Sequence, residues 1–148
     1  MILRLIVENI ASFKNAVEFN TFPSSKSQSH NNHKVKCGHA TALRLGAIYG
    51  ANGAGKSNLI KSLFLLKQLI GLESLQKFPI GDSLAFKLDP TYSERPSGIA
   101  VEFYHGNNIY YYHIEFDRSQ VYTEELLLSK KSKDEPIFKR ENNTINIY

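Results

Sequence analysis

The chain has 148 residues, of which 42% are hydrophobic and 22% are charged, and its formal net charge is +4. This length is enough for one domain with its own core, and the composition excludes a disordered or fibrous protein. The longest apolar stretch, residues 59–72, is interrupted by two lysines and is too short for a membrane span. The N-terminus has no small-residue cleavage site, and the single cysteine cannot form an internal disulfide, so we expect no membrane partner and a reducing, cytoplasmic location.

The positive charge is concentrated in the first half of the chain. Residues 1–71 contain nine Lys/Arg and two Asp/Glu (9 − 2 = +7), whereas residues 72–148 contain nine and twelve (9 − 12 = −3). A basic half suits a polyanionic ligand. A mixed, solvated surface is the alternative, and it explains the charges better than a dedicated DNA-binding track because no run of Lys/Arg occurs.

Hydrophobic periodicity predicts the N-terminal elements. Alternating apolar residues predict strands at Ile2–Glu8 and Val17–Phe19, joined by a turn around Ser12–Asn15. Phe22–Ala40 is rich in Ser, His, Asn and Lys, which predicts a loop. The apolar run Leu43–Tyr49 predicts a third strand that stops at a glycine.

The middle of the chain changes from helical to irregular. Apolar residues recur at helical spacing from Ser57 to about Ile70, and Gly71 is the expected stop. Residues 72–97 contain three prolines and are expected to be irregular.

The C-terminal third has the period of two that is typical of strands. A turn at Gly106–Asn108 separates two alternating segments, which together predict a β-hairpin. The predicted strands of this antiparallel meander are Ile99–Tyr104, Tyr110–Phe116, Val121–Leu128, Ile137–Lys139 and Thr144–Tyr148. Because the sequence ends inside an alternating pattern, we expect it to be a fragment of a longer protein.

One motif carries recognisable chemistry. Residues 50–57 read G-A-N-G-A-G-K-S and match the phosphate-binding pattern G-x-x-x-x-G-K-[ST], between a predicted strand and a predicted helix. Glycines let the backbone wrap closely around phosphates, and the helix N-terminus adds free N–H groups and a positive dipole end. We expect Lys56 to reach the β- and γ-phosphates and the Ser57 hydroxyl to ligate a metal. The expected ligand is ATP with Mg²⁺, and a glycine-rich tight turn is the alternative. The candidate ligand-binding residues are Gly50, Ala51, Asn52, Gly53, Ala54, Gly55, Lys56, Ser57 and Asn58.

The loop and its flanks also resemble a known group of proteins. Y-G-A-N-G-A-G-K-S-N-L-I-K-S-L resembles the head domains of SMC-like and Rad50-like ABC ATPases, in which Asn52 and Asn58 are typical residues. The N-terminal L-I-V-E-N-I-A-S-F-K-N-A-V-E-F is similar to the first hairpin of these heads. Within the group, the chain most resembles the bacterial anti-phage defence ATPases of the OLD-like, Septu-type and PARIS-type proteins. The resemblance is dense at residues 1–20 and 43–70 and loose at 99–140.

The resemblance implies an α/β fold, namely a P-loop NTPase that is the N-terminal lobe of an ABC-type head with an antiparallel β subdomain. Residues 1–71 would form the P-loop core, and residues 72–148 the linker and the subdomain. It further implies an ATPase that works as a dimer or higher oligomer of heads in phage defence and controls a toxic nuclease or effector, with DNA as a further candidate partner. By matching position it places Ser12, Phe13 and Lys14 on the adenosine side, although a plain β-turn with the phenylalanine in the core explains them equally well.

Half of a hydrolytic site is missing from the sequence. Hydrolysis needs an apolar strand that ends in Asp-Glu, where the aspartate helps to hold magnesium and the glutamate orients water. Neither this element nor a Ser-Gly-Gly signature loop is present, and in the ABC family the signature loop comes from the partner head. We therefore assign no catalytic residue beyond phosphate stabilisation by Lys56. A non-hydrolytic nucleotide-sensing or scaffold module and a Rad50-like DNA-repair head remain alternatives, whereas a small-molecule kinase would need an arginine-rich lid and the arginines after the helix are widely spaced.

Three further groups of residues have competing interpretations. Glu124 and Glu125 match a polar position that the family often carries near magnesium, whereas solvated charges that protect a strand edge are the alternative. A metal site is disfavoured for the H-x-x-H-x-x-x-C-x-H pattern because no predicted element supports it, and a polar loop is expected instead. For the tyrosines of the hairpin region, packing is favoured over stacking on nucleic-acid bases. The residues of the last two groups are His30, His33, Cys37, His39, Tyr104, Tyr110, Tyr111, Tyr112 and Tyr122.

Overall fold

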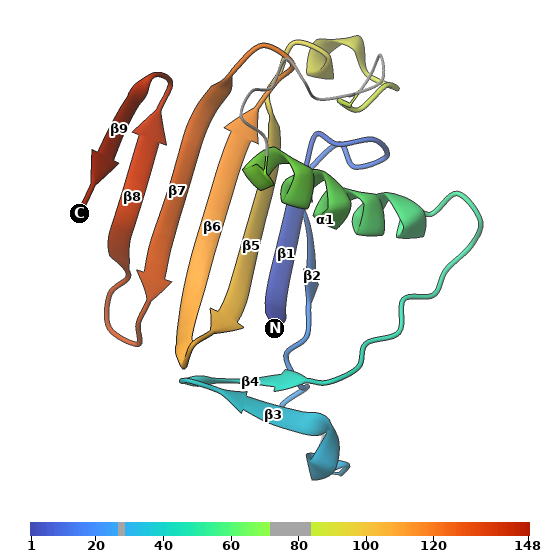
Figure 1. Ribbon diagram of the computed structural model, residues 1–148. Helices are drawn as coiled ribbons and strands as arrows, with labels where there is room; N and C mark the ends of the chain where they lie inside the picture. Colours follow the sequence, from blue (N-terminus) through green and yellow to red (C-terminus); the bar gives the residue numbers. More distant parts are fainter. Residues whose placement is uncertain (27–28, 72–83) are drawn as a thin grey trace.

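A computed structural model describes residues 1–26, 29–71 and 84–148, in which one long helix lies across a face of an antiparallel sheet (Figure 1). The sheet has seven strands in the order β2-β1-β5-β6-β7-β8-β9, and a separate hairpin, β3-β4, lies at one end of it. The strands are β1 (Ile2–Glu8), β2 (Val17–Asn20), β3 (Lys34–Cys37), β4 (Ala40–Leu43), β5 (Ser97–His105), β6 (Asn108–Phe116), β7 (Val121–Ser129), β8 (Glu135–Glu141) and β9 (Thr144–Ile147). The helices are α1 (Lys56–Gly71) and the short 3-10 turns η1 (Asn31–His33) and η3 (Pro90–Tyr92). Within the described part of the chain, no helix is long and apolar enough to cross a membrane.

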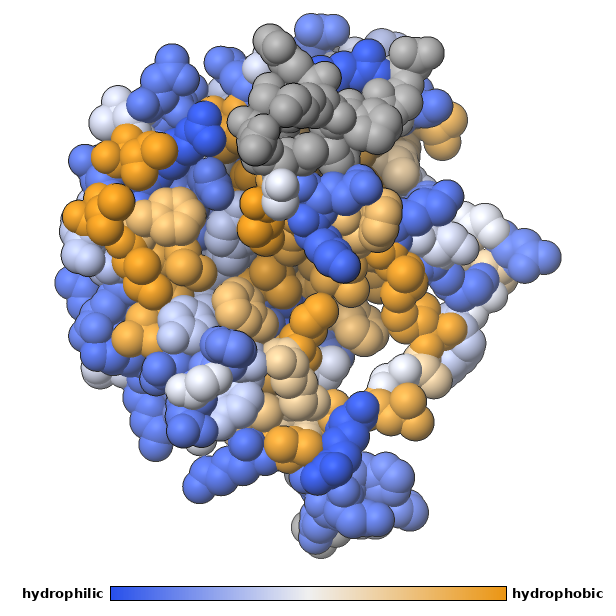
Figure 2. All heavy atoms as spheres, viewed as in Figure 1, coloured by the Kyte–Doolittle hydropathy of each residue, from blue (hydrophilic) through white to orange (hydrophobic). Residues whose placement is uncertain are grey.

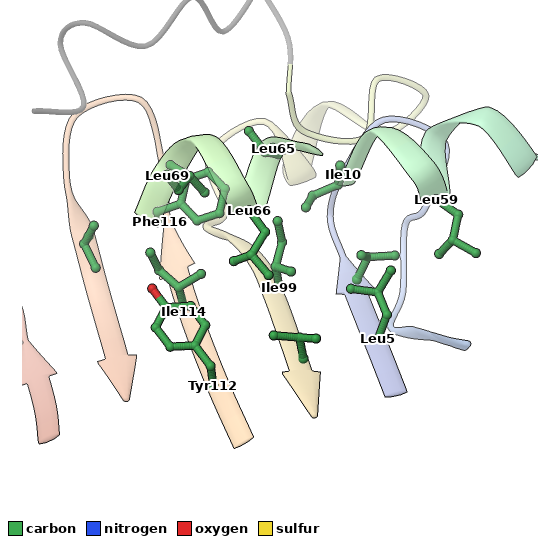
Figure 3. Close-up of a cluster of buried hydrophobic side chains, with 13 residues drawn as sticks. Leu5, Ile10, Leu59, Leu65, Leu66, Leu69, Ile99, Tyr112, Ile114 and Phe116 are labelled. Carbon is green, nitrogen blue, oxygen red and sulfur yellow. The ribbon is translucent and has the colours of Figure 1, made fainter. Parts of the chain in front are cut away.

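The main core lies between α1 and the central strands (Figure 3). Residues at every second position of β1, β5 and β6 face the helix, since successive side chains of a strand point to opposite faces. The helix contributes leucines three, four and seven residues apart, which lie on one face of a 3.6-residue period. Burying each such side chain stabilises the fold by about 1.5–3 kcal/mol. The buried members of this core are Leu5, Val7, Ile10, Leu59, Leu65, Leu66, Leu69, Ile99, Val101, Tyr112, Ile114, Phe116 and Val121.

The predicted helix, the N-terminal strands and the C-terminal meander are confirmed, with ends shifted by a few residues. The hairpin turn is the clearest local case. Gly106 and Asn107 have φ values of 55° and 70°, and two consecutive residues at positive φ are what the favoured two-residue hairpin turn requires. The prediction of irregular structure is confirmed for residues 84–96, which contain only η3. Residues 72–83 lie outside the described residues.

The prediction of a continuous loop over Phe22–Ala40 is wrong. Its second half contains η1 and β3, and β4 begins at its last residue. The short pattern K-V-K-C alternates, and Gly38 at φ 59° lets the chain turn back into β4. Cys37 is buried with Leu3 and Ile109 of the large sheet. The hairpin was not predicted because the segment is mostly polar, and only one face of the hairpin is buried.

The prediction of a third strand over Leu43–Tyr49 is also wrong. Only its first residue belongs to a strand, the end of β4, and residues 44–50 form no ladder with any described strand. Leu45 and Tyr49 are 77% and 93% exposed. An apolar run forms a strand only where a neighbour pairs its backbone groups, and no described strand pairs with residues 44–49. The phosphate-binding loop therefore does not emerge from a sheet strand, contrary to expectation, and α1 is the element that fixes it to the sheet.

The two predicted parts of the chain share one sheet. β1, from residues 1–71, pairs directly with β5, from residues 72–148, and the register includes Leu5 opposite Val101. The outer side of α1 is different from its buried side, because Ile60, Phe64 and Ile70 are exposed. Figure 2 shows that apolar side chains gather on this side of the molecule.

Candidate functional site

The loop Gly50–Ser57 joins an extended segment to the first turn of α1. Gly53 and Gly55 have φ values of 82° and 90°, in the left-handed region that side chains other than glycine rarely adopt. The N–H of Leu59 donates to the carbonyl of Gly55 at 3.0 Å, so the helix starts directly on the loop. No acidic residue lies in the first turn of α1. The positive end of the helix dipole therefore faces the loop without a competing carboxylate of its own turn.

Lys56 lies at the centre of this loop. Its Nζ donates to the carbonyl oxygens of Gly50 and Ala51, at 2.7 Å each. Residues 50–54 and Ser57 are exposed, so the loop opens to solvent. The ammonium group is thus held by two neutral acceptors that an anion can replace, because charge-assisted bonds to phosphate are stronger than bonds to a carbonyl.

The turn between β1 and β2 packs against the loop. A β-carbon added to Gly55 would lie 2.9 Å from Ser12 Oγ and 3.0 Å from the ring of Phe13. Asn58 Nδ2 donates to Ser12 Oγ at 3.0 Å. The structure therefore brings Ser12 and Phe13 to the phosphate-binding loop. Phe13 also packs against the main core, so its role as a core side chain and its position beside the loop are compatible.

Lys14, the third residue of this predicted group, has its described partners in segment 86–97. Its Nζ lies 2.9 Å from Asp89 Oδ2 and 4.9 Å from the centre of the Tyr92 ring. The hydrogen bond that Lys14 donates to Asp89 raises the pKa of Lys14. In turn, hydrogen bonds from Lys14 and then Thr91 lower the pKa of Asp89 to about 2. The lysine is therefore a charged group whose present partner is a carboxylate of the segment that follows the undescribed residues.

Asn9 organises this region, and sequence reasoning gave it no role of its own. Its Nδ2 donates to the carbonyl oxygens of Tyr92 and Arg95, both at 2.9 Å, and of Pro96 at 3.2 Å. Its Oδ1 accepts from the N–H of Phe86 at 3.0 Å. The side chain is 2% exposed, and the backbone has a φ of 50°. An asparagine directly after a strand, which tolerates a left-handed backbone, was the available signal.

Glu124 and Glu125 are engaged in cross-strand pairs. Glu124 accepts a 2.8 Å hydrogen bond from the Tyr112 hydroxyl and lies 3.6 Å from Arg140, while Glu125 lies 3.1 Å from Lys139. Burial and then the bond to Glu124 raise the pKa of Tyr112. The expectation that these carboxylates protect a sheet edge is wrong, because β7 lies between β6 and β8.

The histidine and cysteine pattern is divided between different surroundings. Cys37 Sγ is buried and lies 3.8 Å from Met1 Sδ, while His30 and His33 pack edge to face with ring centres 5.8 Å apart. Among the described residues, no group of three His, Cys, Asp or Glu side chains is placed to hold a metal ion.

The packing interpretation of the tyrosines is confirmed for two of them. Tyr110 stacks on Phe103 with ring centres 5.4 Å apart, and Tyr112 belongs to the main core. Tyr122 donates to Asp117 at 2.6 Å.

Comparison with known proteins adds one family. Residues 46–147, which number 147 − 46 + 1 = 102 of the 148, match the family described as "AAA domain, putative AbiEii toxin, Type IV TA system". The match begins just before the phosphate-binding loop and extends through the antiparallel strands. A search of curated proteins finds no match.

Proposed function

This chain belongs to that AAA domain family, whose members contain a P-loop ATPase domain, and we propose that its loop Gly50–Ser57 binds ATP with Mg²⁺. The observation that carries the proposal is the position of Lys56. Its ammonium group lies inside a solvent-open loop, on the carbonyl oxygens of Gly50 and Ala51, at the N-terminus of a 16-residue helix.

The chemistry of binding follows from these groups. Phosphate oxygens displace the two carbonyl acceptors and take the charge-assisted bonds of Lys56. The N–H groups of the loop and of the first turn of α1 donate to the same oxygens. The exposed Ser57 hydroxyl supplies one oxygen ligand to Mg²⁺, which keeps several waters and otherwise binds phosphate oxygens. The donors of the loop and of the first turn of α1 suit a triphosphate–magnesium complex.

Hydrolysis needs groups that the described residues do not place at the loop. Lys56 makes no ion pair with a described carboxylate, and Glu124 is held by Tyr112 and Arg140. Charge that develops on the transferred phosphoryl group needs donors around it. We therefore propose that a second ATPase head covers the exposed loop and completes a composite site in a homodimer or a higher oligomer. The exposure of residues 50–54 leaves room for that cover.

The cellular role that we propose is defence. The family description names a toxin and a toxin–antitoxin system, and the resemblance of the loop and first hairpin to anti-phage ATPases supports the same role. In this proposal, ATP binding controls a toxic nuclease or effector partner, and DNA is an alternative partner for a Rad50-like DNA-repair head. A non-hydrolytic nucleotide sensor is the second candidate, and the observation that favours it is the lack of contact between any described carboxylate and Lys56 or Ser57.

Calorimetric titration of the full chain with Mg-ATP tests the proposal. Lys56→Ala removes the charge-assisted contacts and is expected to weaken binding about 10- to 150-fold, which corresponds to about 1.5–3 kcal/mol. Lys61→Ala is the matched control, because this lysine is also on α1 and is exposed outside the loop. Equal affinities of the wild type and Lys56→Ala for Mg-ATP would refute the assignment of the loop.

A further inference from the structure

Lys14 belongs to the β1–β2 turn, which contacts the phosphate-binding loop, and its side chain reaches Asp89 of segment 86–97. It is two residues from Ser12, whose Oγ accepts from Asn58 on α1. Two residues span at most about 7 Å, so the Cα atom of Lys14 lies within about 7 Å of the Cα atom of Ser12, which contacts the loop. A lysine has a flexible four-carbon stem with a charge at its tip, and it can sweep from this position over the loop.

The side chain of Lys14 is paired with Asp89. Asp89 uses its two carboxylate oxygens for different partners. Oδ1 accepts from the N–H of Thr91 at 3.1 Å and from its hydroxyl at 2.8 Å, and Oδ2 faces Lys14 Nζ at 2.9 Å. The first oxygen therefore caps η3, and the second neutralises the lysine.

Segment 86–97, which carries Asp89, is fixed to the end of β1. Asn9 binds the carbonyl oxygens of Tyr92 and Arg95, and Ser97 Oγ donates to the carbonyl of Asn9 at 2.7 Å. The Tyr92 ring lies under both Lys14 and Arg95, at 4.9 and 4.4 Å from their charged groups. Asp89 therefore belongs to a short turn that is fixed in place, and Lys14 pairs with it from the β1–β2 turn.

The contact between the two side chains is easily broken. The side chain of Lys14 is 42% exposed and that of Asp89 is 28% exposed. Exposed ion pairs contribute little because water screens them and because two side chains must be ordered. A triphosphate bound at Gly50–Ser57 would bring several negative charges to the mouth of the same loop, where they attract the ammonium group more strongly than one carboxylate does.

We propose that Asp89 competes with the phosphates of the bound nucleotide for Lys14. In the free protein Lys14 is paired with Asp89, and on nucleotide binding it leaves Asp89 and pairs with the phosphates. The proposal rests on the proposed function and adds to it a residue that sets nucleotide affinity from outside the loop. Asp89 is a positioning residue, since it acts through Lys14 and does not touch the nucleotide.

The first arm of the test removes the competitor. Asp89→Asn keeps an oxygen for the Thr91 cap and loses the negative charge, so Mg-ATP should bind the full chain about two- to fivefold more tightly in calorimetric titration. Asp89→Ser, which also supplies a capping oxygen, provides a second variant if the first unfolds. Glu94→Gln is the matched control, because this exposed carboxylate belongs to the same segment and its one described bond is to Ser93, and its affinity should be unchanged.

The second arm separates competition from a structural effect. Lys14→Met should weaken Mg-ATP binding, and Asp89→Asn should then produce no further change in this background. The proposal is overturned if Asp89→Asn leaves the affinity unchanged or weaker, if Lys14→Met has no effect, or if the Asp89→Asn effect persists without Lys14. Lys56→Ala is titrated alongside. If that variant binds Mg-ATP like the wild type, the proposed function itself fails, whereas its loss of binding together with an unchanged Asp89→Asn affinity rejects only the competition.

Discussion

Ser12 lies so close to Gly55 that a β-carbon added to the glycine would stand 2.9 Å from the serine Oγ. The contact joins the β1–β2 turn to the phosphate-binding loop, which are 43 residues apart in the sequence (55 − 12 = 43). Gly55 has to be glycine for two reasons, its φ of 90° and the lack of space for a β-carbon.

Gly55→Ala should therefore disturb the loop more than Gly53→Ala. Both positions have a left-handed backbone, which costs about 1–2 kcal/mol for a residue with a β-carbon. At Gly53 nothing lies within 4 Å of the added atom, so strain is the whole effect. At Gly55 the turn must also move, which adds about 1–3 kcal/mol as in other overpacked sites. Urea unfolding and Mg-ATP titration of both variants measure this difference, and equal losses in the two variants would contradict the contact.

Asn9→Ala should destabilise the fold strongly. It removes the donor shared by three carbonyl oxygens and the acceptor for Phe86 N–H, and leaving buried polar groups unpaired costs about 1–3 kcal/mol each. We expect a loss of at least about 3 kcal/mol in the free energy of unfolding. Asn142→Ala is the control for backbone strain alone, because Asn142 has a similar φ of 52° on an exposed turn. A small, equal change in both variants would show that the Asn9 side chain does not fix segment 86–97.

Glu124→Gln should leave nucleotide binding unchanged. The carboxylate is paired with Arg140 at 3.6 Å and accepts from Tyr112 at 2.8 Å, and the glutamine oxygen can still accept the tyrosine bond. We expect a stability loss of about 1 kcal/mol or less and the same Mg²⁺ dependence of ATP affinity as in the wild type. Titration of ATP at several Mg²⁺ concentrations checks this, and a variant that no longer responds to Mg²⁺ would restore the magnesium role considered from the sequence.

Asp117 should make the protein sensitive to acid. Burial acts to raise its pKa, but hydrogen bonds from Tyr122, Ser119 and Gln120 outweigh burial and lower the pKa to about 2, from an ordinary value of 3.8. Because the folded-state pKa is the lower one, the carboxylate stabilises the fold above pH 3.8, and this contribution is lost as the pH falls towards 2. The group is only partly buried, so solvent screening limits its contribution to about 1 kcal/mol.

Asp117→Asn should therefore flatten the dependence of the urea midpoint on pH between 2 and 5. Asp134→Asn, at an exposed turn residue, serves as the control for the change in net charge. If the urea midpoints of both variants fall between pH 5 and 2 as steeply as that of the wild type, the hydrogen bonds around Asp117 do not stabilise its charged form.

Local patterns in the sequence determined much of this protein. The motif Gly50–Ser57, the helix after it and the alternating strands after residue 97 were predictable, because their signals repeat every two or 3.6 residues or depend on glycine at fixed positions. The hairpin turn at Gly106–Asn107 belongs to the same class, since its backbone conformation restricts which residues can occupy it. The resemblance named residues 12–14 as candidates for the adenosine side. The structure places Ser12 and Phe13 at the loop, and their role towards adenosine stays a prediction.

Only the tertiary structure decided which distant groups meet. The apolar run Leu43–Tyr49 has strand character, yet it forms no strand beyond Leu43 because strand formation depends on a partner that no local pattern reveals. The polar segment around Cys37 folds into a hairpin because one face of it packs on the large sheet. Asn9 reaches Tyr92 across 83 residues, and Lys14 meets Asp89 across 75 (89 − 14 = 75). Side chains such as these are placed by the packing of β1 against β5, so their partners become visible only once the sheet has brought the two halves of the chain together.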